Sequence, residues 1–288
     1  MIDLERETIA VDLTYPLRWR VNSILYGTHS ATGHSDSGNF KGFQPFSRHP
    51  DIRRLDLRRS LRDPFAQWWV KDYEPRAPVQ IYLLVDISAS MQAGQGQRQL
   101  DLATRICTAV AHAAYRNGDA LSFFACGSDI EFQSAASNQR ATASSARMIR
   151  SWLLKASAQA QNANGLALAA RRLKHSRSLV FLLSDFMFSL EQCRQLLDPL
   201  RRHDVVPIVL DTYQLNARSA WGLSTWYDAE TGQSKLLFMR PSLFKRWHAQ
   251  QQQREQEINQ LFHRFGMSPF RPGESFNAQL LARHLMER

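Results

Sequence analysis

The chain has 288 residues, of which 44% are hydrophobic and 22% charged, and its formal net charge is +10. This composition is that of an ordinary globular protein and excludes a disordered or fibrous chain. Arginine accounts for 30 of the 36 basic residues, spread along the chain without a basic tail, so charge alone does not separate a nucleic-acid partner from acidic protein partners. Three widely spaced cysteines argue against a disulfide framework or a zinc site.

Residues 1–78 show no clear helical or strand period, and we expect an irregular or β segment there. A Gly/Ser/His-rich stretch at 27–38 precedes an arginine-dense stretch at 48–64, and the many large aromatic residues predict that this segment packs on the core. The acidic N-terminus is unlike a signal peptide, and the longest apolar runs are far shorter than the ~20 residues of a membrane helix. We therefore expect a cytoplasmic protein without membrane insertion.

Residues 79–213 have the pattern of an α/β domain. The run VQIYLLVDI at 79–87 predicts a strand buried on both faces of a parallel sheet. Further strands are predicted at 120–126, 130–132, 178–186 and 205–211. The predicted helices are one that ends near Asn117, two at 144–156 and 165–175, and one that ends at about Arg202. Strands alternating with helices predict a doubly wound, mostly parallel sheet flanked by helices, as in Rossmann-like folds.

Residues 214–288 are predicted to form a hairpin and helical extension of this domain. Alternating residues suggest a two-stranded hairpin with its turn near Thr231 and Gly232. A helix capped by Ser242 is predicted to end at Gly266, and a final short helix to span 276–285.

Oxygen-bearing side chains follow two of the buried strands. Asp86, Ser88 and Ser90 form a D-x-S-x-S pattern directly after the run YLLV of the first, and Ser184 and Asp185 lie at the end of the second. The carboxyl ends of parallel strands meet at one edge of a sheet, where Asn164, at a predicted helix start, adds a third loop. Such oxygens suit Mg²⁺, so the spacing predicts a metal site; the alternative is that they only cap helices and form turns.

The segment YLLVDISASM resembles the metal-ion-dependent adhesion site of von Willebrand factor A-like domains, whose pattern is D-x-S-x-S, then a Thr in a second loop and an Asp in a third. The resemblance implies that Asp86, Ser88, Ser90 and Asp185 bind Mg²⁺, or Mn²⁺ or Ca²⁺. The second-loop Thr falls on Asn164, which departs from the pattern and leaves the metal requirement open.

The flanking segments resemble bacterial proteins that accompany MoxR-type AAA+ ATPases, known as domain-of-unknown-function family fifty-eight. The run HPDIRRLDLRRSLR at 49–62 resembles their motif, with His49, Pro50 and Leu57 in place of the usual Gly, Asp and Trp, and a D-x-E-T-G sequence follows at 228–232. The matched charged residues look like an internal ion-pair network between the N-terminal segment and the core: Asp51, Arg53, Arg54, Asp56 and Arg62. The resemblance implies a MoxR-type ATPase as partner and a role in assembling, activating or metallating a client complex. Because some relatives lie in methanol-oxidation gene clusters, a quinoprotein methanol dehydrogenase is a candidate client.

These observations favour a non-enzymatic, metal-dependent protein-binding adaptor, in which an acidic client offers a carboxylate to the ion. A hydrolase is disfavoured, because Ser88 stands where an aspartyl-nucleophile phosphatase needs a second Asp, and neither a G-x-S-x-G nor a P-loop motif occurs. Nucleic-acid binding through Arg53–Arg62 is a weaker alternative, since acidic residues are interspersed there. A metal-independent scaffold is the other alternative.

Overall fold

The computed structural model describes residues 13–19, 29–30, 38–48, 50–92, 96–134, 139–156, 163–210, 222–227, 234–273 and 275–288. The chain divides into two compact units. The first comprises Met1–Pro16, Gln80–Arg116 and Ala120–Arg288, and the second comprises Leu17–Val79 and Asn117–Asp119.

A five-stranded sheet in the order β6-β5-β4-β7-β8 forms the centre of the first unit. Its parallel strands are β4 (Gln80–Asp86), β5 (Ala120–Cys126), β7 (Leu179–Ser184) and β8 (Asp204–Val209), and β6 (Ile130–Gln133) pairs antiparallel with β5 at one edge. Every residue of the four parallel strands is buried, which is why these strands are predominantly apolar in the sequence. The predicted doubly wound α/β architecture is confirmed.

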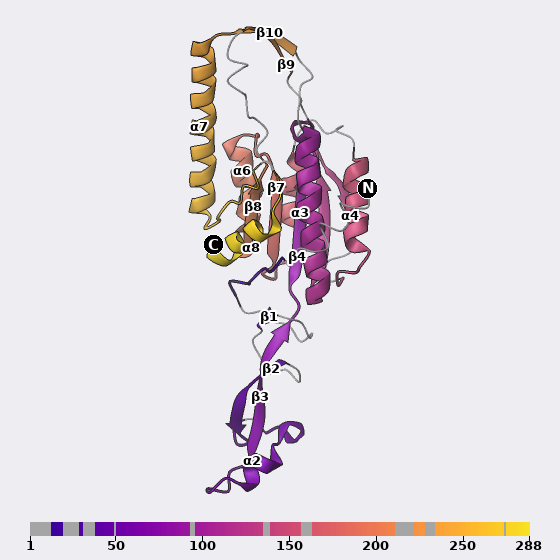
Figure 1. Cartoon of the computed structure of the whole chain (residues 1–288), viewed down its shortest axis with the longest axis vertical. Helices are drawn as coiled ribbons and strands as arrows, with labels where there is room; N and C mark the ends of the chain where they lie inside the picture. The colour runs from indigo at the N-terminus through magenta and orange to yellow at the C-terminus, as the bar shows by residue number, and fades with distance from the viewer. Residues whose placement is uncertain are drawn as a thin grey trace. The chain divides into compact units, whose positions relative to one another are not determined.

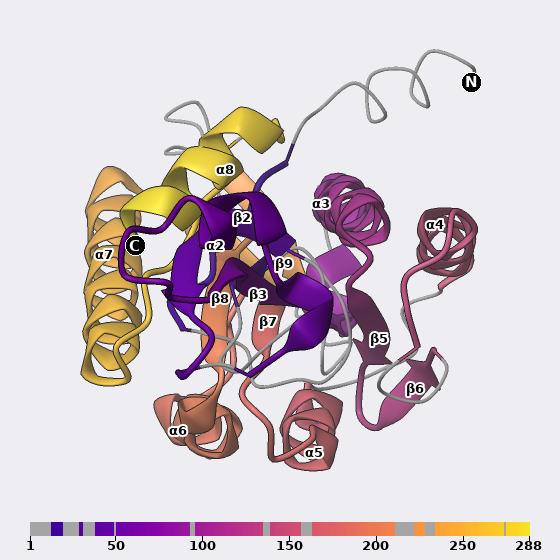
Figure 2. The ribbon, with the colours of Figure 1, turned by 90° about the horizontal axis from the view of Figure 1, so that it is seen from below.

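Helices cover both faces of this sheet (Figure 2). One face carries α3 (Gly96–Asn117) and α4 (Ser145–Lys155), and the other carries α5 (Asn164–Arg172) and α6 (Leu190–Leu197), which continues into the 3-10 helix η3 (Asp198–Arg202). Sheet side chains such as Tyr82, Leu84 and Val180 form one apolar cluster with Leu166 of α5 and Leu196 of α6. None of the helices in the described part of the chain is both long enough and apolar enough to cross a membrane.

The C-terminal part of the first unit adds a hairpin and two helices (Figure 1). The hairpin pairs β9 (Gly222–Tyr227) with β10 (Ser234–Met239), and the predicted turn at Thr231 and Gly232 lies outside the described residues. Helix α7 (Pro241–Arg264) follows, and α8 (Ala278–Glu287) ends the chain. The prediction that Ser242 caps the first of these helices is wrong: α7 begins at Pro241 with Arg240 in the cap position, because proline suits the first helical turn.

The second unit contains a small antiparallel sheet, in the segment predicted to be irregular or β, but the sequence pattern did not locate its strands. Its order is β1-β3-β2, with β1 (His29–Ser30), β2 (Gly38–Pro45) and β3 (Trp69–Ala77), and the short helices η1 (Ile52–Arg54) and α2 (Leu57–Leu61) lie between β2 and β3 in the chain. A register shift between Phe40 and Gly42 breaks the alternation in β2, and both longer strands contain a proline. These irregularities hide the two-residue period.

His203, between η3 and β8, is only 7% exposed, and its ring lies edge-on to Tyr82 at 6.5 Å between centroids. Burial, helped by the charges of Arg202 and His175, lowers the pKa of His203 from 6.5 to about 4. The unfolded chain therefore takes up this proton at a higher pH than the folded chain does. His203 thus contributes stability that is present above pH 6.5 and is lost as the pH falls towards about 4.

We expect His203 to lower the free energy of unfolding by up to about 1.4 kcal/mol for each pH unit of acidification in this window. Urea unfolding of the wild type and of His203→Asn across that pH range measures the effect, and the slope should be flatter in the variant. The same substitution at the exposed His248 is the control and should keep the wild-type slope. A wild-type slope in His203→Asn would contradict the prediction.

Candidate metal centre

The strand order of the first unit reverses at β4, since β5 and β6 lie to one side of it and β7 and β8 to the other. In open α/β sheets, ligands bind beyond the carboxyl ends of the strands at such a reversal. β4 ends at Asp86, and β7 ends at Ser184, immediately before Asp185. Asp86 is therefore the last residue of β4, and Asp185 directly follows the adjacent strand β7. We call this place, where the strand order reverses, the switch point.

Asp86 is completely buried, and both oxygens of its carboxylate accept hydrogen bonds. The backbone N–H of Ser88 donates to Oδ1 at 2.9 Å, and the Ser184 hydroxyl donates to Oδ2 at 2.6 Å. Burial raises the pKa of Asp86, whereas the hydrogen bonds from Ser184 and Ser88 act in the opposite direction. The bond to Ser184 joins the ends of β4 and β7. The sequence places Ser184 among the oxygen donors at the end of the second strand, but it was not one of the predicted metal ligands.

Ser88 and Ser90 lie where the chain leaves β4 and enters the 3-10 helix η2 (Ala89–Gln92). Ser88 is buried, Ser90 is half-buried, and their hydroxyl oxygens are 3.1 Å apart. Two ligands on adjacent corners of an octahedral magnesium site, each about 2.1 Å from the ion, lie about 3 Å from one another. The two hydroxyls form a hydrogen bond, and their spacing is also compatible with both of them binding one such ion.

Asp185 lies in a loop that α7 holds in place. The carboxylate is buried, and its Oδ1 accepts a hydrogen bond from Met187 N–H at 3.1 Å. Phe186 has a φ of 52°, a left-handed conformation that is strained for a bulky residue, and its buried ring packs edge-on against Phe262 of α7 at 5.1 Å. The Arg254 guanidinium, also on α7, donates to the carbonyls of Phe186 and Phe188. Nothing in the local sequence of α7 identifies Arg254 as a residue that supports the site.

Asn164 is the first residue of α5 and is exposed. One of its contacts is to α6, where Gln192 Nε2 donates to its side-chain oxygen at 3.4 Å. The next residue, Gly165, packs on the loop after β5 and donates its N–H to the Gly127 carbonyl at 2.8 Å. Direct hydrogen bonds thus connect Asp86, Ser88, Ser90 and Ser184. The contact between Asn164 and Gln192 instead joins α5 to α6.

The donor set fits a hard divalent cation. Within the described residues, no three His, Cys, Asp or Glu side chains form a group that could hold a metal ion. The switch-point residues instead supply the carboxylates of Asp86 and Asp185 and the hydroxyls of Ser88 and Ser90. Oxygen ligands of this kind suit Mg²⁺, Mn²⁺ or Ca²⁺ and do not suit metals that prefer sulfur.

The charged residues of the arginine-dense motif lie in the second unit. Asp51 accepts a hydrogen bond from Arg53 N–H at 3.0 Å and pairs with Arg54 Nε at 3.1 Å. Asp56 caps α2 by accepting from the N–H of Arg59 at 2.9 Å. Arg62 is exposed and forms no ion pair with a described residue. These hydrogen bonds and this ion pair join residues of the second unit to one another.

A protein-family model described as "Protein of unknown function DUF58" matches residues 45–258. The chain belongs to the DUF58 family. The match extends from the end of β2 in the second unit to the buried part of α7 in the first. It therefore includes both the switch-point residues and the arginine-dense motif of this DUF58 protein.

Two solved structures are similar to the DUF58 chain in fold. An aerotolerance-related membrane protein from Bacteroides fragilis NCTC 9343, crystallised with multiple mutations to serines, has 12% sequence identity and a TM-score of 0.45, over 73% of this chain and 97% of that one. The conserved hypothetical protein BatB from Bacteroides thetaiotaomicron has 11% identity and a TM-score of 0.42, over 73% of this chain and 98% of that one. A search of curated proteins gave no match.

Proposed function

We propose that this DUF58 protein is a non-enzymatic, metal-dependent protein-binding adaptor with its metal site at the switch point of the first unit. The observation that carries the proposal is the pair of hydroxyls on Ser88 and Ser90, 3.1 Å apart and next to the buried Asp86. A bound Mg²⁺, Mn²⁺ or Ca²⁺ would offer a coordination position to a carboxylate of an acidic client.

The residues of the chain have distinct roles in this proposal. Ser88 and Ser90 supply hydroxyl oxygens to the ion. Asp86 supplies negative charge and keeps the loop in place, since its two oxygens accept from Ser88 and Ser184. Asp185 adds a second carboxylate, and Asn164 offers an amide oxygen from the second loop. Arg254 positions the Asp185 loop through its bonds to the Phe186 and Phe188 carbonyls.

The proposed cooperating partner is a MoxR-type AAA+ ATPase. The support for this partner is the resemblance of the arginine-dense motif and of residues 228–232 to proteins that accompany such ATPases. The sequence contains no P-loop motif, so ATP hydrolysis is assigned to the partner. Together the two proteins would assemble, activate or metallate a client complex, with a quinoprotein methanol dehydrogenase as a candidate client.

Metal binding is tested first, on the full chain, by titration with Mn²⁺ followed by electron paramagnetic resonance. We expect Ser90→Ala to weaken Mn²⁺ binding at least about tenfold, because it removes one ligand and leaves Asp86 and its hydrogen bonds in place. Asp86→Asn should weaken it further, with circular dichroism to check the fold. Ser151→Ala, at an exposed position on α4, is the matched control and should bind as the wild type does. Wild-type affinity in Ser90→Ala and in folded Asp86→Asn would exclude this site.

Partner binding is tested next, by capturing the purified ATPase on immobilised full chain with Mg²⁺ or with a chelator. We expect both the chelator and Ser90→Ala to reduce capture, while Ser151→Ala leaves it unchanged. Undiminished capture in both cases would favour the metal-independent scaffold and contradict the adaptor proposal. Salt-sensitive binding of single-stranded DNA in place of the ATPase would favour the nucleic-acid alternative.

A further inference from the structure

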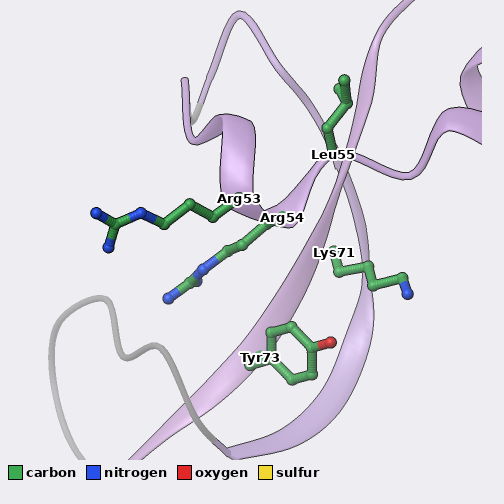
Figure 3. A pocket seen from close by; sticks show the side chains of 5 residues that line it. All are labelled: Arg53, Arg54, Leu55, Lys71 and Tyr73. Atoms are coloured by element: carbon green, nitrogen blue, oxygen red, sulfur yellow. The ribbon is translucent and has the colours of Figure 1, made fainter.

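The second unit contains a basic pocket that the proposed function does not use. Its volume is about 290 Å³, and the residues that line it are Arg53, Arg54, Leu55, Lys71 and Tyr73. Figure 3 shows the two arginines extending from the region of η1 on the same side, and Lys71 and Tyr73 on the strand beside them. Lys71 and Tyr73 are two residues apart on β3 and so belong to the same face of that strand. A β-bridge between Leu55 and Val70 holds the end of η1 against β3.

Arg54 is fixed in this pocket before any ligand arrives. Its side chain is 7% exposed, its Nε lies 3.1 Å from Asp51 Oδ2, and its guanidinium lies over the Tyr73 ring at 5.8 Å from the centroid. A buried guanidinium that is held on both sides loses little conformational entropy when a ligand binds.

Arg53 and Lys71 are the more accessible cations of the pocket. Arg53 is exposed and forms no ion pair with a described residue, and Lys71 has a 44% exposed side chain with Asp56 Oδ2 at 3.8 Å. Asp51 pairs with Arg54, and Asp56 lies near Lys71, so Arg53 is the cation of this pocket that has no ion pair with a described residue. One exposed guanidinium of this kind suits a single carboxylate.

We propose that this pocket binds a carboxylate side chain on an acidic, partly apolar peptide segment of a partner protein. Planar guanidinium groups pair well with carboxylates. Leu55 and the Tyr73 ring provide an apolar wall, and their sequence neighbours Ile52 and Leu57 are 77% and 57% exposed, so apolar side chains of the same peptide have surfaces to contact. This proposal is independent of the metal site, which lies in the other unit.

The test uses the full chain in the presence of a chelator, so that the metal site does not contribute. The probe is a fluorescein-labelled peptide of alternating leucine and glutamate pairs, and its binding is followed by fluorescence anisotropy. We expect Arg53→Gln to weaken binding about tenfold, because it removes one charge-assisted contact. Arg58→Gln, which makes the same charge change at an exposed position of α2 outside the pocket, should bind as the wild type does.

The outcomes separate the specific pocket from its alternatives. A peptide with glutamine in place of glutamate should bind at least about tenfold more weakly to the wild type. Equal losses in Arg53→Gln and Arg58→Gln would show diffuse charge attraction and would overturn the proposal. So would a lack of binding at millimolar peptide, or displacement of the peptide by single-stranded DNA at a much lower concentration.

Discussion

Replacing Arg288 by methionine is expected to lower the free energy of unfolding by about 3–5 kcal/mol, because it leaves the buried carboxylate of Asp204 without its cation. The guanidinium Nη1 and Nη2 donate to the two Asp204 oxygens at 3.1 and 2.8 Å. The two side chains are only 2% and 4% exposed. This ion pair joins the end of α8 to the first residue of β8, so its loss affects the packing of the C-terminal helix on the central sheet.

Urea unfolding measures this effect, and α8 itself provides the control. Arg283 pairs with Glu287 on the same helix at 2.8 Å, but its side chain is 75% exposed, so Arg283→Met should cost far less stability than Arg288→Met. In the double variant Arg288→Met with Asp204→Leu, apolar groups replace both charges, and much of the lost stability should return. Equal effects of Arg288→Met and Arg283→Met would contradict this account of the ion pair.

The substitution Gly165→Ala is the second change expected to have a large effect. A Cβ atom at this position would lie 2.1 Å from the Asp129 carbonyl oxygen and 2.7 Å from that of Gly127. Both are backbone atoms, so α5 and the loop after β5 must move apart. We expect a loss of about 3 kcal/mol in the free energy of unfolding, at the upper end of overpacking effects.

The same substitution tests whether the start of α5 belongs to the metal site. Asn164 precedes Gly165, so a displaced α5 should also weaken Mn²⁺ binding if Asn164 contributes to the site. Gly42→Ala is the control, because a Cβ there would meet no atom within 4 Å. Gly165→Ala with the stability of Gly42→Ala would contradict the packing argument, and wild-type Mn²⁺ affinity in a destabilised Gly165→Ala would remove Asn164 from the proposed ligands.

Much of the first unit could be predicted from the sequence, because its signals are local. A strand buried on both faces is apolar over most of its length, so β4 and β7 are evident as the runs IYLLV and LVFLL. The positions of Asp86 and Asp185 at the ends of these strands follow from the same runs. The wrong prediction for Ser242 has an equally local cause, since proline at the first helical position outweighed the preference for serine at a cap.

The sequence by itself determined the α/β class, the buried strands and the aspartates and serines that follow them, because each depends on neighbouring residues. Only the tertiary structure decided that Ser184 donates to Asp86, 98 positions away, and that Arg254 holds the loop after Asp185. It also decided that Lys71 and Tyr73 of an irregular strand join Arg53 and Arg54 in a pocket. These contacts depend on strand order and helix packing between distant segments, and no local pattern of residue types encodes such pairings.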